Sequence, residues 1–115
     1  MKPADDKPLV ARKIGKITEP LNAGFPPIPY GTQPCSLDLS ADGKMAAVVT
    51  YFRVFLFPRA EGESWETAFA RKPATLEPHR LRQAESVCFS RDGASIFVVS
   101  EGVKSPLVVW RRGKE

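Results

Sequence analysis

The sequence predicts an all-β protein made of two four-stranded antiparallel sheets and one short helix. Three observations predict this fold: a repeat at a fixed offset, an Asp-Gly pair at the same place in both copies, and short apolar runs rich in Val, Ile and Phe. The chain has 115 residues, of which 11 are proline, and the prolines cluster between the apolar runs. Because proline interrupts helices, this spacing disfavours a helix bundle and favours short elements joined by turns.

The repeat begins with residues 36–43 (SLDLSADG), which align with residues 86–93 (SVCFSRDG). Second apolar runs follow at 45–50 and 96–100, and third runs at 53–57 and 107–110. An Asp-Gly pair between apolar runs is a hairpin signal, because glycine tolerates positive φ and aspartate bonds the turn backbone. Each unit therefore predicts three consecutive strands, with Asp42 and Asp92 as turn formers. The second strand of each unit is apolar on both faces, so it must be covered on both sides.

A second similarity predicts the fourth strand of each sheet. Residues 11–20 (ARKIGKITEP) resemble residues 70–78 (ARKPATLEP). Both are predicted as outer strands, where proline is tolerated because an edge strand need not donate every N–H. The chain then forms a single unit over 1–115, with a leading outer strand at 8–20, a first sheet at 35–78 and a second at 85–112.

Residues 64–70 predict a short helix between the third and fourth strands of the first unit. Ser64 is a suitable N-cap, and Trp65 and Phe69 lie i, i+4 on one helical face. We expect this aromatic pair to pack in the core rather than to bind a ligand. Cys88 lies in an apolar strand, which predicts a small buried core residue. A disulfide between Cys35 and Cys88 would require an oxidising compartment.

Charge indicates no particular partner. The 17 Lys and Arg residues exceed the 13 Asp and Glu residues by four, but they are scattered, and no nucleic-acid-binding motif accompanies them. The sole histidine, His79, is expected in a surface loop between the two units. No apolar run approaches the roughly 20 residues of a membrane helix, so no membrane association is expected. No secretory signal is recognised, which predicts a cytoplasmic protein unless a leader has been removed.

With four strands per unit and an Asp-Gly hairpin in each, the repeat resembles the blades of a β-propeller. The resemblance is to bacterial propellers of the NHL-like and phytase- or esterase-like kinds. It is carried by residues 83–93 (QAESVCFSRDG) and 100–102 (SEG), while the first unit has Ala41 where proline is usual. The resemblance implies two blades with the strand order d-abc-d-abc.

The resemblance also implies where ligands would bind, because the innermost strands of a propeller line a central channel. The channel-facing candidates are Asp38, Glu85, Glu101, Tyr51 and Arg53. In the phytase-like propellers, acidic groups matching Glu85 and Glu101 hold calcium and substrate phosphate, so calcium is one interpretation for these two side chains. The alternative is that both glutamates bond backbone N–H groups or pair with neighbouring arginines.

Two blades alone leave large apolar sheet faces bare, and such faces mark association sites. We expect either a homo-oligomeric ring of three or four copies or a part of a longer propeller. The function this favours is a non-catalytic interaction or ligand-binding scaffold. The alternative is a part of a metal-assisted hydrolase of phosphate or other esters, and the sequence leaves the question of enzymatic activity open.

Overall fold

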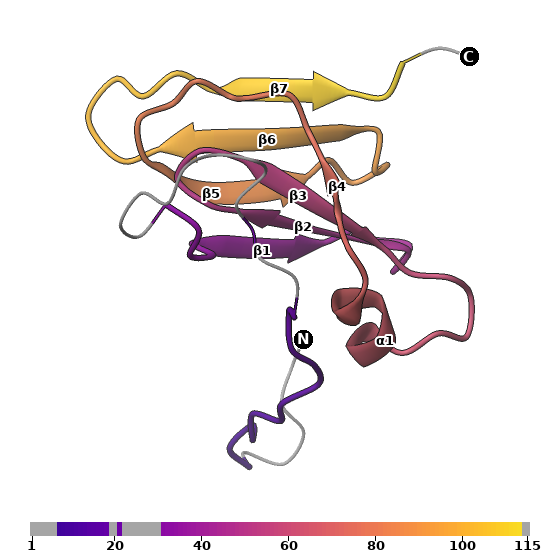
Figure 1. Ribbon diagram of the computed structural model, residues 1–115. Helices are drawn as coiled ribbons and strands as arrows, with labels where there is room; N and C mark the ends of the chain where they lie inside the picture. The colour runs from indigo at the N-terminus through magenta and orange to yellow at the C-terminus, as the bar shows by residue number, and fades with distance from the viewer. Residues whose placement is uncertain (1–6, 19–20, 22–30, 114–115) are drawn as a thin grey trace.

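The computed structural model describes residues 7–18, 21 and 31–113, and in this part of the chain two antiparallel sheets pack face to face (Figure 1). The first sheet has the strand order β1 (Ser36–Leu39), β2 (Met45–Val49), β3 (Val54–Pro58) and β4 (Ala74–Thr75). The second has the order β5 (Ala84–Phe89), β6 (Ser95–Ser100) and β7 (Val108–Arg111). One helix, α1 (Trp65–Ala70), lies between β3 and β4. The mainly β architecture and the position of the helix are confirmed.

Both predicted Asp-Gly turns are formed, and they have the same hydrogen bonds. The Asp42 carboxylate accepts from the Ser40 hydroxyl at 2.7 Å and from the N–H of Lys44 at 3.0 Å. Asp92 accepts in the same way from the serine two residues before it and from the N–H two residues after it. These bonds, chiefly those from the serines, hold the pKa of both carboxyl groups below the usual value. Asp42 and Asp92 are therefore turn formers, as predicted.

The main core lies between the two sheets. Side chains alternate along each strand, so every second residue of β2, β3, β5 and β6 points into this layer. Its buried members include Ala47, Val49, Val54, Val87, Ile96 and Val98. The first sheet thus buries one face against the second sheet.

The opposite face of the first sheet is covered by α1 and by the N-terminal segment. Phe55 and Phe57 project from β3 into this second core, where the Phe69 ring lies 5.2 Å from that of Phe57. Trp65 stacks on Phe69, so the packing role predicted for this pair is confirmed. The Ser64 hydroxyl caps the helix by accepting from the N–H of Thr67 at 3.1 Å. The central strand β2 is therefore covered on both sides.

The outer strand expected at 8–20 is not formed over residues 8–18, and residues 19–20 lie outside the described part of the chain. The segment is instead anchored beside the helix. The Thr18 hydroxyl donates to the carbonyl of Ala70 at 3.1 Å, and Ile17 packs on the second core. Both contacts hold the segment beside α1, far from the edge of β7 (Figure 1). The second sheet consequently has three strands in the described residues, where four were expected.

Cys88 is exposed, so the expectation of a buried core residue was wrong. Alternation in β5 turns Val87 toward the first sheet and Cys88 toward the opposite face. No described residue packs over that opposite face to form a core. Cys35 is half-buried, and both cysteines are free thiols. Within the described residues, no helix has the length and hydrophobicity needed to traverse a bilayer.

Candidate functional site

Three of the predicted site residues meet at one end of the two sheets. Tyr51 lies in the turn between β2 and β3, Glu85 lies in β5, and Glu101 directly follows β6. Backbone hydrogen bonds join these segments: the N–H of Ala84 donates to the carbonyl of Tyr51 at 3.3 Å, and the N–H of Glu101 donates to the carbonyl of Gln83 at 3.2 Å. The structure therefore brings together three of the five residues that the resemblance marked as channel-facing candidates.

The electrostatics of this end are set by the two glutamates. The negative charge of Glu85, followed by burial and the charges of Cys35 and Glu101, raises the pKa of Tyr51. Burial, followed by the charge of Glu85, raises the pKa of the Cys35 thiol. Both groups are consequently protonated at neutral pH, so they are hydrogen-bond donors rather than nucleophiles.

Asp38 has a different environment from these three residues. Its carboxylate accepts a hydrogen bond from the N–H of Phe89 at 2.8 Å, across the interface between the sheets. The hydroxyl of Ser36 accepts more weakly from the N–H of Val87 at 3.4 Å. These two N–H groups lie on the edge of β5 that faces away from β6. Asp38 thus joins the first sheet to β5, an edge strand of the second.

Arg53, the fifth candidate, bonds the segment that leads from the first sheet to the second. Its guanidinium donates from Nη1 to the carbonyl of Leu76 at 3.0 Å, just after β4. The side chain is half-buried, and it lies close enough to His79 for its charge to affect that ring.

His79 is buried, with 5% of its surface exposed, so the expectation of a surface-loop histidine was wrong. Its Nδ1 accepts from the N–H of Leu81 at 3.0 Å, and its ring meets Trp110 edge-on with the centroids 6.4 Å apart. Burial, and then the charge of Arg53, lowers its pKa against an opposing effect of the Thr50 backbone. The loop that carries His79 crosses from one sheet to the other, and this crossing brings the ring against β7.

The described residues contain no group of three or more His, Cys, Asp or Glu side chains that could hold a metal ion. Calcium takes about six to eight oxygen ligands. Glu85 and Glu101 alone offer too few, so calcium binding at this pair would need further oxygen ligands, such as backbone carbonyls or water.

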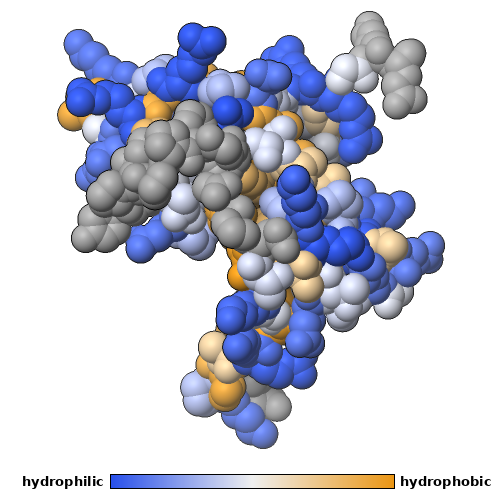
Figure 2. All heavy atoms as spheres, in the orientation of Figure 1, coloured by the Kyte–Doolittle hydropathy of each residue, from blue (hydrophilic) through white to orange (hydrophobic). Residues whose placement is uncertain are grey.

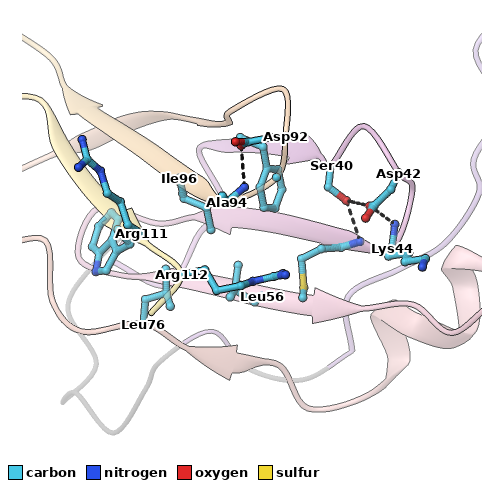
Figure 3. A pocket seen from close by; sticks show the side chains of 14 residues that line it. Ser40, Asp42, Lys44, Leu56, Leu76, Asp92, Ala94, Ile96, Arg111 and Arg112 are labelled. Atoms are coloured by element: carbon cyan, nitrogen blue, oxygen red, sulfur yellow. Dashed lines mark hydrogen bonds between the residues drawn. The ribbon is translucent and has the colours of Figure 1, made fainter. Parts of the chain in front are cut away.

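A groove that sequence reasoning missed opens at the other end of the sheets, beside the two Asp-Gly turns (Figure 3). Its volume is about 510 Å³, and residues of both sheets line it. Of its lining residues, Asp42, Asp92 and Gly93 were predicted to form the turns. No sequence signal reveals the groove, because it exists only where the ends of two separate sheets face each other.

Comparison with protein-family models, with curated proteins and with solved structures finds no match to this chain.

Proposed function

We propose that this protein is a non-catalytic interaction module of the β-propeller-blade kind, which associates with further copies of itself to form a ring of three or four chains. One observation carries the proposal. The first sheet has four strands and two covered faces, whereas the second has three strands and one covered face in the described residues. Association would complete the second sheet.

The open face of the second sheet supports this proposal. The strand register places Cys88, Phe97 and Val109 in one row across β5, β6 and β7 on that face, with Val99 next to them on β6. None of these four side chains belongs to either buried core. Apolar side chains in a row on one sheet face are stabilised when another layer removes them from water.

The contact between the two sheets of one chain supports a second copy of the chain as the partner. In the first sheet, the face that carries Ser36 and Asp38 is covered by the second sheet. Ser86 and Cys88 occupy the matching positions of the repeat, on the open face. A third sheet of the same kind is therefore the expected cover, and a second copy of this chain supplies one.

The N-terminal segment supports the same partner. Residues 7–14 adopt no regular secondary structure, and Leu9, Val10 and Ile14 are 64%, 88% and 51% exposed. Figure 2 shows hydrophobic atoms on the surface of this segment at the bottom of the view. The edge of β7 carries no strand partner other than β6 among the described residues. The segment resembles the one that contains β4, so it is suited to pair with β7 of a neighbouring copy.

The experiment that tests this proposal is the solution mass, measured by light scattering during gel filtration. We expect a mass of three or four chains for the unmodified protein. Phe97→Lys, which places a charge on the open face, and Val10→Lys, which places one on the N-terminal segment, are both expected to shift the protein to a smaller species. Circular dichroism verifies that each variant is folded.

Val103→Lys is the matched control, because Val103 is 94% exposed in the loop between β6 and β7 and lies on neither proposed surface. It is expected to keep the mass of the unmodified protein. A folded monomer at micromolar concentration, before any substitution, contradicts self-association. The remaining form of the scaffold hypothesis would then be that further blades of a longer chain complete the second sheet.

A further inference from the structure

We propose that the groove between the two sheets binds a small amphipathic anion, a molecule with a flat apolar body and a carboxylate head group. This site goes beyond the association proposed above. It lies between the covered faces of the two sheets, whereas association would use the open face and the β7 edge.

The groove has the size and the floor of a small-molecule site. Its volume of about 510 Å³ falls within the roughly 300–1,000 Å³ of ordinary ligand pockets. Leu56 and Leu76 contribute to its lining from the first sheet, and Phe89, Ile96 and Trp110 contribute from the second. All five are half-buried or buried members of the main core region, so they form an apolar floor open to solvent on one side. A flat hydrocarbon or aromatic body is suited to such a floor.

The rim of the groove favours a negative head group. Lys44 and Arg112 line it, and within the described residues neither side chain forms a hydrogen bond or an ion pair. Arg111 also borders the groove, but alternation along β7 turns its side chain to the open face, on the same side as Val109. The two carboxylates of the rim, Asp42 and Asp92, each accept two hydrogen bonds within their own turns. The cationic side chains therefore keep donors available, while the acidic ones are already engaged.

The position of Arg112 adds a geometric reason. In Figure 3 its side chain extends along the groove in the direction of Asp42, and its charge lowers the pKa of that carboxyl group. Its backbone N–H donates to the carbonyl of Ala94 at 2.8 Å, which fixes the residue next to the second turn. A guanidinium held beside an apolar floor offers paired N–H donors to a carboxylate.

The test uses phenylbutyrate as the probe and its neutral amide, phenylbutyramide, as the matched ligand. Trp65→Phe leaves Trp110 as the remaining one of the two tryptophans, so its fluorescence reports on the groove. We expect a saturable change with phenylbutyrate, and an affinity about five-fold weaker for the amide, which corresponds to the loss of about one ion pair.

Variants then locate the binding. In the Trp65→Phe background, Arg112→Gln is expected to weaken phenylbutyrate binding about five-fold and to leave amide binding nearly unchanged. Arg82→Gln is the matched control, because Arg82 lies before β5, at the opposite end of the second sheet. Val99→Ser, on the open face, is also expected to leave binding unchanged.

Several results would overturn the proposal: no saturable change with phenylbutyrate, equal affinity for acid and amide, or full phenylbutyrate binding in Arg112→Gln. Loss of binding in Val99→Ser would assign the probe to the open face and would equally overturn it. Because fluorescence and solution mass are separate readouts, failure of this site is distinguishable from failure of self-association.

Discussion

The Asp38 carboxylate in the first sheet and the N–H of Phe89 in the second form a hydrogen bond of 2.8 Å that joins the two sheets directly. Among the described residues, strand β5 pairs only with β6, so the N–H groups on its other side have no strand partner there. Asp38 satisfies one of these groups, and its charge strengthens the bond. The stacking of the sheets therefore depends on a polar contact as well as on the apolar core.

Replacing Asp38 by alanine should destabilise the protein by about 1–3 kcal/mol, because the half-buried N–H of Phe89 loses its acceptor. Urea unfolding followed by circular dichroism measures this change. Asp38→Asn keeps an acceptor oxygen, so its free energy of unfolding should fall by less. Ser36→Ala removes a longer hydrogen bond of 3.4 Å, so its free energy of unfolding should also fall by less than that of Asp38→Ala. An unchanged unfolding free energy in Asp38→Ala would show that the bond contributes nothing.

Replacing Glu85 by glutamine should lower the pKa of Tyr51 toward its ordinary value, because the charge of Glu85 is the main cause of the raised pKa. Ultraviolet absorbance titration measures phenol ionisation, and Tyr30→Phe removes the signal of the other tyrosine. Glu101→Gln is the control, since its charge is the smallest of the four contributions and its effect should be smaller. An equal or larger effect of Glu101→Gln would place Glu101, not Glu85, next to the phenol.

The protein should lose stability as the pH falls through the ordinary histidine pKa of 6.5, and His79 should be the cause. Burial lowers the pKa of the folded ring, so the folded state holds the neutral form and binds fewer protons than the unfolded state. The stability contributed by the neutral ring is fully present above pH 6.5. It is lost progressively as the pH falls from 6.5 to the lower pKa of the folded ring. Urea unfolding across this range measures the slope.

His79→Asn is the matched variant for this pH effect, because its side-chain oxygen can still accept from the N–H of Leu81 but does not titrate. It should flatten the pH dependence near neutral pH. It should leave the loss of stability at lower pH that follows from the lowered pKa values of carboxyl groups such as Asp42 and Asp92. Since the chain has a single histidine, a slope that persists in His79→Asn would contradict this assignment.

Gly43→Ala should destabilise the protein more than Gly93→Ala, although the two glycines occupy equivalent turns. Both have positive φ, 72° and 74°, which costs an alanine about 1–2 kcal/mol. A Cβ at Gly43 would also lie 2.9 Å from the guanidinium of Arg59, whereas a Cβ at Gly93 meets nothing within 4 Å. Arg59 bonds the Gly43 carbonyl at 2.8 Å and lies over Trp65, so moving it has a further cost. Thermal melting of both variants compares them, and equal losses would show that Arg59 moves freely.

The amino-acid sequence determined the features that depend on neighbouring residues. Asp42 and Asp92 fold their turns through bonds to residues two positions away, and Ser64 caps α1 through a residue three positions away. Because such contacts need no distant partner, the hairpins and the helix could be predicted. The repeat also defined the strand ends that carry Tyr51, Glu85 and Glu101, but their meeting depends on the contact between the two sheets.

The tertiary structure decided the features that depend on what covers a face or an edge. Alternation along β5 fixes that Val87 and Cys88 point in opposite directions, but only the position of the first sheet decides which of them is buried. In the same way, the crossover between the sheets buries His79, and the contact of Thr18 with Ala70 keeps the N-terminal segment away from β7. The groove belongs to this class too, because its apolar floor and basic rim come from sheet ends that are distant in sequence. Local chemistry sets the strands and turns, and the packing of one layer on another sets burial, exposure and sites.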